Sequence, residues 1–274
     1  MKSEKPLSRR VRAYLFTRRL LARIQNGAVA VHRGLFLGLL DPSELQALTD
    51  HHYTSTQSGG TGDVNYHETA YNLSGLRYWE QRVIEEHFRD CRSILLGAAG
   101  GGREILALSR MGFAVDAFEC NPQLAARCQS FLELQGVEAT VIQAEPGGVP
   151  ASLEIYDGAI LGWGAYIHIF GRRRRVELLR EFRQHLRAGA PLLLSFWTAR
   201  DSISIRAQTQ LAKFIRAIRR AEPIESGDSI SSTFDRSFAK NDIRDELAEA
   251  GFEMVFYSEE FFGHAVGRAV TSAD

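Results

Sequence analysis

The stretch SILLGAAGGGREILALSRMGF, residues 93–113, joins a short apolar run to a glycine-rich turn and then to a helical pattern. The apolar run at 94–96 predicts a buried strand, and residues 102–111 predict a helix that ends at Gly112. Nucleotide-binding α/β folds hold their ligand at such a junction, because the turn and the helix N-terminus bring backbone N–H groups together. The stretch therefore predicts an α/β fold with a ligand at this turn.

Strand and helix signals alternate along the chain after this stretch. An alternating order implies parallel strands with helices on both faces of the sheet. Residues 242–270 change the order, because one helix is followed by two strands with a short connection. The sequence thus predicts a Rossmann-like α/β fold with a seven-stranded, mostly parallel sheet and an antiparallel C-terminal strand. Further strands are expected at 113–118, 137–143, 158–161 and 191–197, with helices at 121–134 and around 176–186.

The predicted organisation has two parts. Residues 1–75 form a helical N-terminal extension, and residues 76–274 form the α/β domain. An insertion at about 198–238 interrupts this domain with an amphipathic helix and then a polar segment containing SGDS. Polar aromatic residues around the flexible loop at 54–63 predict that the extension acts as a lid, which excludes water from the site.

The overall composition excludes several classes of partner and compartment. The chain has 33 basic and 33 acidic residues, so its net charge gives no case for nucleic acid. Its three cysteines form neither a CxxC motif nor an even framework, which indicates a reducing compartment. The longest early apolar run, GLFLGLL, is too short for a transmembrane segment and lies late for a signal peptide. We expect a cytoplasmic protein.

The N-terminal extension carries a local excess of positive charge. Residues 1–33 hold nine Lys/Arg and one acid, and residues 7–25 show the pattern of an amphipathic cationic helix. Such a helix suits an anionic membrane surface, a partner's groove or a homodimer contact. Packing on its own domain with a solvated basic face is the favoured alternative. Asp41-Pro42 marks the start of a second helix, because aspartate caps helices and proline suits their first position.

Three glycine-rich turns compete as interpretations of residues 97–104. A phosphate-binding P-loop requires a Gly-Lys-Ser/Thr ending, whereas this turn ends in Gly102-Arg103-Glu104, so we exclude it. The dinucleotide motif GxGxxG fits poorly, because its third glycine falls on Ile105. A GxGxG-type turn, Gly97-x-Ala99-x-Gly101, remains. Its small residues let the backbone approach an amino-acid-plus-nucleoside ligand that has no pyrophosphate.

Glu119 is the second marker of the ligand. It ends the second predicted strand, 22 residues after Gly97. An acid at this place accepts hydrogen bonds from both hydroxyls of a ribose that lies across the carboxyl ends of the strands. Capping of the next helix is the alternative role, and the paired spacing of turn and acid favours the ribose.

With these residues in place, the chain resembles the class I S-adenosylmethionine-dependent methyltransferases over roughly residues 76–270. The resemblance rests on LLGAAGGGRE, VDAFECNP, YDGAILGWGAYIHI, LRAGAPLLLSFW and the terminal AGFE and HAVGRAV pair, which occur in the order of the family. It implies S-adenosylmethionine as cofactor. By this resemblance Glu119 binds the ribose, and Cys120 and Glu145 lie at the adenine. The methionine end is implied to lie against Gly97, Ala98, Ala99 and Gly101.

Two departures from the family pattern concern the same end of the cofactor. The family commonly has an acid two residues before the first glycine, where this chain has Leu95, and its second glycine is Ala99 here. Ala99 is still expected to line the cofactor with its neighbours. The cofactor's ammonium group then needs another partner, for which Glu104 or the backbone at Gly162 is the candidate.

The segment GWGAYIHIF after the strand at 158–161 is expected beside the reacting centre. His168 is the candidate general base, because imidazole titrates near neutral pH, and Tyr166 is a second catalytic candidate. A histidine that only binds a backbone carbonyl is the alternative for His168. Trp163 is the candidate contact for a flat or cationic acceptor, with a packing role as its alternative.

The lid supplies further candidates. Tyr66 and His67 are expected to contact the substrate, and Tyr71 is a catalytic candidate. The His and Glu donors of this segment show no helical i, i+4 pair, so no metal site is predicted.

The resemblance implies an enzyme that transfers a methyl group to an O, N or S nucleophile of a small molecule, by in-line displacement in a lidded site. The enclosing extension and insertion argue against DNA or folded protein as acceptor, and no basic and aromatic stripe suits RNA. Two alternatives stay open. One is an accessory or interaction protein with weakened catalysis, which Leu95 and Ala99 keep open. The other is a related nucleoside-cofactor enzyme, such as an aminopropyltransferase or a reductase.

Overall fold

The computed structural model describes residues 9–55, 65–199 and 203–270. The chain divides into two compact units, Met1–Leu40 with Asp201–Ile230 and Asp41–Arg200 with Ser231–Asp274. This division differs from the predicted boundary at residue 75. Residues 41–75 belong to the larger unit, and the smaller unit joins the start of the chain to most of the predicted insertion.

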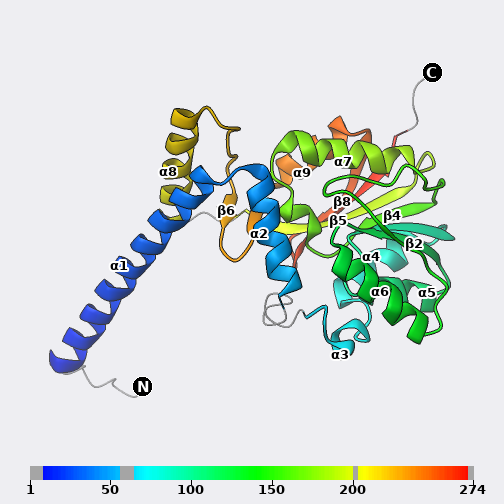
Figure 1. The fold of residues 1–274 in the computed structure, drawn as a ribbon, viewed down its shortest axis with the longest axis horizontal. Helices are drawn as coiled ribbons and strands as arrows, with labels where there is room; N and C mark the ends of the chain where they lie inside the picture. Colours follow the sequence, from blue (N-terminus) through cyan, green and yellow to red (C-terminus); the bar gives the residue numbers. More distant parts are fainter. Residues whose placement is uncertain (1–8, 56–64, 200–202, 271–274) are drawn as a thin grey trace, which may run out of the picture. The chain divides into compact units, whose positions relative to one another are not determined.

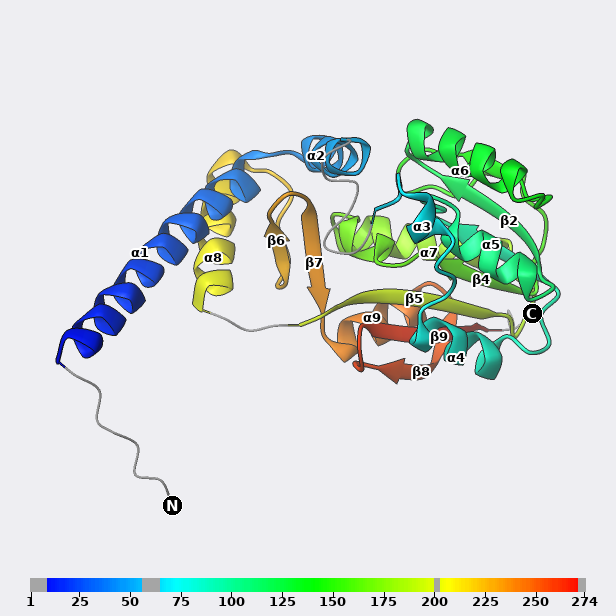
Figure 2. The same cartoon turned by 90° about the horizontal axis from the view of Figure 1, so that it is seen from below.

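A mostly parallel sheet forms the centre of the larger unit. β1 (Ser93–Gly97) lies between β2 (Ala114–Glu119) and β4 (Gly158–Leu161), and all three are parallel. β9 (Gly263–Ala269) is antiparallel to both of its neighbours, as predicted for the C-terminal strand. Figure 2 shows β5 with β4 on one side and β9 on the other. The order β3-β2-β1-β4-β5-β9-β8, with β3 at Val141–Gln143, β5 at Pro191–Thr198 and β8 at Phe252–Ser258, confirms a mostly parallel sheet with an antiparallel C-terminal strand. Among the described residues the sheet has nine strands, two more than predicted.

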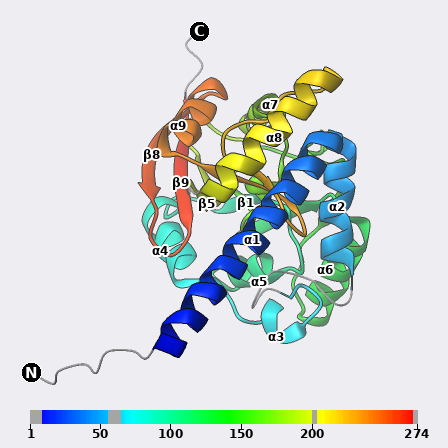
Figure 3. The same cartoon turned by 90° about the vertical axis from the view of Figure 1, so that its left-hand side faces the viewer.

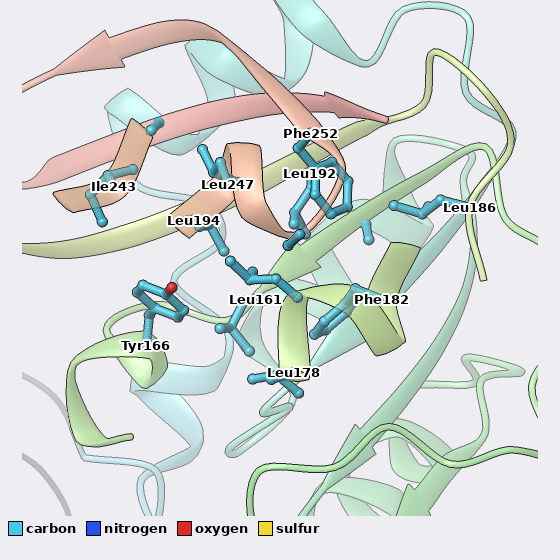
Figure 4. Packing of buried hydrophobic residues seen from close by; sticks show 14 of the residues in the cluster. Leu161, Tyr166, Leu178, Phe182, Leu186, Leu192, Leu194, Ile243, Leu247 and Phe252 are labelled. Carbon is cyan, nitrogen blue, oxygen red and sulfur yellow. The ribbon is translucent and has the colours of Figure 1, made fainter. Parts of the chain in front are cut away.

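Helices cover both faces of this sheet, as the alternating order predicts (Figure 1). One face carries α7 (Arg172–Gln184) and α9 (Lys240–Glu249), whose apolar sides form one core with the strands. Figure 4 shows Phe182 of α7 and Leu247 of α9 within this core. The other face carries a second core, formed with α4 (Tyr78–His87), α5 (Arg103–Arg110) and α6 (Pro122–Leu134).

The end of the predicted insertion is part of the larger unit. β7 (Phe234–Phe238) pairs in parallel with the last residues of β5, where Trp197 lies opposite Ser237. Phe234 and Phe238 are fully buried, while the residues between them alternate in burial. The last residues of the predicted insertion thus form a strand of the sheet. The alternating pattern FDRSF was the local signal of this strand.

Three short segments lie around the carboxyl ends of the parallel strands. α2 (Pro42–Thr54) starts where the Asp-Pro pair predicts, and Glu44 accepts a hydrogen bond from the backbone N–H of Asp41 at 2.8 Å. α3 (Thr69–Asn72) precedes α4, and a 3₁₀ helix, η1 (Ala165–His168), follows β4.

The smaller unit contains two helices that lie side by side, α1 (Arg9–Leu39) and α8 (Ile203–Arg219) (Figures 1 and 3). Gly34 and Gly38 permit the close packing, because a Cβ on Gly38 would lie 2.7 Å from Ile215. The buried Arg216 donates to Leu37 O at 2.9 Å. α1 is longer than the predicted helix at 7–25, because the sequence after residue 25 stays mostly apolar and has no proline before Pro42.

Several apolar side chains of α1 are exposed, among them Phe16 at 68% and Ile24 at 61%. An exposed apolar stripe on a cationic helix is typical of a contact surface, so a surface contact through α1 stays a prediction. Within the described ranges, no helix combines the length and apolar character that a bilayer crossing requires.

Candidate functional site

The turn after β1 has a left-handed backbone conformation. Ala98, Gly100 and Gly102 have φ values of 58°, 55° and 93°. Residues with a side chain rarely adopt this region, so an alanine held there marks a turn whose shape is constrained by function. The turn leads directly into the N-terminus of α5, and its N–H groups lie at the edge where the parallel strands end.

Other groups approach the turn so closely that side chains are excluded. A Cβ on Gly97 would lie 2.7 Å from the rings of Phe118 and Phe182. A Cβ on Gly162 would lie 2.5 Å from Ala98 O, and Gly162 N donates to Gly97 O at 2.8 Å. Gly97 and Gly162 therefore allow the segments after β1 and β4 to pack directly against each other.

Two residues of the N-terminal segment cover the turn. The Tyr66 ring lies against Gly100, where an added Cβ would meet Cε1 at 2.9 Å. The Asn72 side chain lies against Gly101 in the same way, and its Nδ2 donates to Tyr66 O at 3.1 Å. Tyr66, a predicted substrate contact, thus lies directly on the glycine turn.

Replacing Gly101 with alanine should destabilise the larger unit by about 1–3 kcal/mol, because the new methyl group overlaps the buried Asn72 amide, with Cγ only 2.8 Å away. Urea denaturation measures the change. Gly148→Ala is the matched control, because a Cβ there meets nothing closer than 3.6 Å. Equal loss of stability in both variants would show that this contact does not limit the turn.

Glu119 ends β2 beside the turn and is 5% exposed. Its Oε2 accepts from the backbone N–H of Gly100 at 2.9 Å, and its Oε1 accepts from the N–H of Asn121 at 2.9 Å. Burial raises the pKa of Glu119, and these hydrogen bonds oppose that effect. Oε2 can accept a second hydrogen bond, and the second contact of Oε1 is a weak one from the Cys120 thiol, so the group is oriented and still able to bind hydroxyls.

A cavity lies at the carboxyl ends of β1, β2 and β4, and α2 forms part of its wall. Its empty volume is about 880 Å³, which includes open solvent at the mouth. Gly97, Ala99, Gly101 and Gly162 are absent from its lining and shape the turn from behind. The predicted residues that line the cavity are Tyr66, Ala98, Glu119, Cys120, Glu145, Trp163 and His168.

The wall after β2 and β3 is formed by Cys120 and Glu145. The Cys120 Sγ lies 3.6 Å from Glu119 Oε1, and burial raises the pKa of this thiol, which keeps it neutral. Glu145 is exposed at the mouth, next to Pro146 and Gly147. This wall offers a neutral surface with one carboxylate at its rim.

Trp163 lies between the cavity and a buried network of charges. The Arg77 guanidinium lies 4.4 Å from the centre of its ring. The backbone N–H of Trp163 donates to Glu104 Oε1 at 3.2 Å, and Glu104 also accepts from Arg103 at 2.8 Å. Arg103 in turn makes two hydrogen bonds of 2.7 Å to Glu80. The network fixes the backbone after β4, which places the indole at the cavity.

His168 is held between α2 and β7. Its Nε2 lies 2.8 Å from Tyr53 Oη, and its Nδ1 lies 2.8 Å from Phe234 O. The Nδ1 is also 3.3 Å from Asp235 Oδ1, which accepts from Thr233 Oγ1 at 2.9 Å. The backbone contact that was the alternative for His168 is therefore present, and the same residue lines the cavity.

Three other predicted residues lie outside the cavity lining. Tyr166 is fully buried, and its hydroxyl donates to Glu246 within the core rather than lining the cavity. The Tyr71 ring lies edge-on to Tyr66, and its hydroxyl has no partner among the described residues. His67 binds Tyr53 O through Nε2 at 3.1 Å, which supports the segment that carries Tyr53.

Sequence reasoning did not select Tyr53, Asp235 or Arg77 as site residues. Tyr53 belongs to the polar aromatic cluster next to the loop at 54–63, so a local signal existed. Asp235 lies 67 residues after His168, in the segment expected as an insertion, and no local pattern joins the two. Arg77 immediately precedes α4 and had no motif around it.

Solved structures with the same fold include three methyltransferases. A SAM-dependent methyltransferase from Methanosarcina mazei has a TM-score of 0.58 at 16% identity, covering 72% of this chain and 100% of the other. An amino pentose methyltransferase from Micromonospora echinaspora, with SAM bound, has a TM-score of 0.54 at 14% identity, covering 77% and 99%. A sugar N-methyltransferase from Streptoalloteichus has a TM-score of 0.54 at 17% identity, covering 80% and 97%.

No protein-family model matches the sequence, and a search of curated proteins finds no match. The chain thus has the fold of the class I S-adenosylmethionine-dependent methyltransferases.

Proposed function

We propose that this chain, which has the class I methyltransferase fold, transfers a methyl group from S-adenosylmethionine to an O, N or S atom of a small molecule. The observation that carries the proposal is Glu119, a buried carboxylate oriented by two backbone N–H groups in the wall of the cavity. It lies beside a strained, left-handed turn that leaves no room for side chains. A ribose and a short amino-acid tail match these two features.

The residues around the cavity fit each part of the cofactor. Glu119 is assigned to the ribose hydroxyls, and Cys120 and Glu145 are assigned to the adenine. The turn at Ala98 is assigned to the methionine end, where a backbone without bulky side chains permits close approach. Glu104 lines a smaller cavity that shares Leu161 and Trp163 with the first, and it is our candidate for the ammonium group.

S-adenosylmethionine supplies, when bound, a methyl group on a sulfonium sulfur. The chain must place the acceptor in line with that group and exclude water from it. Trp163 and Tyr66 both line the cavity, and Tyr66 lies against Gly100 of the turn, so we assign them to the acceptor. α2 adds Thr49, Asp50 and Tyr53 to the wall, and this enclosure suits a small acceptor. The acceptors named for the sugar methyltransferases with this fold are also small molecules.

The two residues that depart from the family pattern, Leu95 and Ala99, do not obstruct the cavity. Leu95 and Ala99 are buried in the cores, at 0% and 1% exposure, and neither lines the cavity.

Calorimetry on the full chain tests the proposal. We expect micromolar binding of both S-adenosylmethionine and S-adenosylhomocysteine, because the residues assigned to the ribose and the adenine would contact the nucleoside that the two share. NADPH and decarboxylated S-adenosylmethionine serve as comparison ligands for a reductase and an aminopropyltransferase. Preferred binding of either comparison ligand, or no binding of the first two, would refute the proposed function.

A further inference from the structure

The hydrogen-bond partners of His168 determine which of its ring nitrogens carries the proton. The two groups at Nδ1, Phe234 O and the Asp235 carboxylate, are both acceptors, so Nδ1 must donate. In the neutral ring Nε2 then carries a lone pair, and the Tyr53 hydroxyl donates to it across 2.8 Å. The free lone pairs of Tyr53 Oη remain available to the cavity, which Tyr53 lines.

We propose that Tyr53, His168 and Asp235 form a proton relay that removes the proton of an acceptor hydroxyl, and that the chain is therefore an O-methyltransferase. The inference rests on the proposed function and names its acceptor class. It also changes the expected role of His168. Because Nε2 is occupied by Tyr53, the acceptor's proton goes first to Tyr53 Oη, and His168 acts through that hydroxyl.

The bonds and charges of the transfer balance without a further reactant. The acceptor oxygen forms a bond to the methyl carbon as the carbon–sulfur bond breaks. The electron pair of the broken carbon–sulfur bond goes to sulfur. The acceptor's O–H proton moves to Tyr53 Oη while the Tyr53 proton moves to His168 Nε2. The resulting imidazolium lies 3.3 Å from the Asp235 carboxylate, and its proton passes to water after product release. The net products are a methyl ether, a neutral thioether and a proton.

Concerted transfer is required, because burial raises the pKa of the Tyr53 hydroxyl and a free tyrosinate is unfavourable. The geometry for such a transfer is present, since Tyr53 Oη lies 2.8 Å from His168 Nε2 and the Asp235 carboxylate lies 3.3 Å from Nδ1. Asp235 is a positioning residue in this scheme. It fixes the proton on Nδ1 and stabilises the charge that forms on the ring, as the buried aspartate does in serine hydrolases.

The need for a proton relay indicates which class of acceptor the site binds. A general base accelerates transfer only when the attacking atom carries a proton at working pH, as a hydroxyl does. A neutral amine attacks through its lone pair and gains little from a base. A three-residue relay directed at the cavity therefore favours a hydroxyl or phenol as acceptor.

The other ionisable groups near His168 do not take the roles of Tyr53 and Asp235 at its two ring nitrogens. His52, also on α2, has its pKa lowered by burial and by His168, so it stays neutral near neutral pH. Arg173 and Arg174 of α7 line an adjoining cavity that His168 also lines. Among these groups, Asp235 is the carboxylate within ion-pair distance of the ring.

Nitrogen NMR on protein with labelled histidine tests the tautomer without any acceptor. The signal of His168 is identified by its loss in His168→Gln, among the eight histidines of the chain. We expect a proton on Nδ1 and none on Nε2 when the ring is neutral. A proton on Nε2 would overturn the relay. Loss of cofactor binding in calorimetry would refute the proposed function but would not change this measurement, so the two failures are distinguishable.

Transfer of a labelled methyl group to three surrogate acceptors tests the relay itself. Phenol carries a proton at pH 9, 4-nitrophenol is ionised there, and aniline attacks through a neutral nitrogen. Tyr53→Phe should slow transfer to phenol about a hundredfold, while transfer to the other two changes by at most about threefold. Tyr78→Phe, an exposed tyrosine outside the cavity, should change none of them. Equal slowing of all three acceptors, or turnover of aniline without phenol by the unmodified protein, would overturn the proposal.

The pH profile of Asp235→Asn separates positioning from a merely structural effect. Without the carboxylate the imidazolium is less favoured, so the acid limb of kcat for phenol should move to lower pH. The plateau rate should fall about tenfold or more, because the charged ring in the transition state has lost its counter-ion. Asp245→Asn, at an exposed site on α9, is the matched control. An unshifted acid limb in Asp235→Asn would overturn the role of Asp235.

Discussion

Replacing Glu119 with alanine should weaken the binding of S-adenosylmethionine and S-adenosylhomocysteine about ten- to a hundredfold. Hydrogen bonds to a charged group contribute about 1.5–3 kcal/mol each, and 1.4 kcal/mol corresponds to a factor of ten. The variant also leaves the N–H groups of Gly100 and Asn121 without their acceptor. The turn after β1 should therefore loosen, which adds to the loss.

Calorimetry with both ligands measures the change in affinity. The free energy of unfolding of the same variant shows whether loosening of the turn contributes to that change. Glu133→Ala is the matched control, since Glu133 is exposed on α6 and outside the cavity. Glu119→Gln keeps the shape but turns one acceptor into a donor that faces a backbone N–H, so it should also bind weakly. Unchanged affinity in Glu119→Ala would mean that the ribose lies elsewhere and that the assignment of the cofactor is wrong.

The sheet was predictable because its signals are local. The strand expected at 158–161 is β4 at Gly158–Leu161, and the one expected at 113–118 is β2 at Ala114–Glu119. The strand expected at 137–143 begins only at Val141. Val137 N still donates to Leu132 O, so the first apolar residues of that run close the end of α6. Hydrophobicity alone does not separate a helix end from a strand start.

The same reasoning explains which site residues were found. Glu119 and the glycine turn lie within 22 residues of each other and are joined by a spacing rule, so the sequence identified both. Asp235 reaches His168 only because β7 pairs with the end of β5, a contact that no local pattern indicates. Long-range pairing of this kind has to be seen in the structure.

Tyr166 shows how local geometry reverses a sequence expectation. It lies two residues before His168 in η1, and a 3₁₀ helix has about three residues per turn, so the two side chains point in different directions. His168 points to the cavity, while Tyr166 points into the core and binds Glu246. The helical conformation after β4 thus separates the two side chains.

Replacing Arg103 with leucine should destabilise the larger unit by about 3–5 kcal/mol, because it leaves buried carboxylates without their cation. Arg103 is 2% exposed and binds Glu80, Glu104 and the backbone oxygen of Gly75. Urea denaturation measures the loss. Arg110→Leu on the exposed side of α5 is the matched control, and Arg103→Lys is a milder second variant, because one ammonium group cannot serve both carboxylates.

The pH dependence of this loss identifies its cause. Burial already raises the pKa of Glu80 in the folded protein, and removal of the guanidinium should raise it further. A folded-state pKa above the unfolded value of about 4.3 means that the folded protein holds the proton more tightly. The variant should therefore be most stable below that pH and lose stability as the pH rises through the folded-state pKa of Glu80. The difference between Arg103→Leu and the unmodified protein should grow between pH 5 and pH 8. A difference that does not change with pH would assign the loss to packing, and the network behind Trp163 would then hold the site by shape rather than by charge.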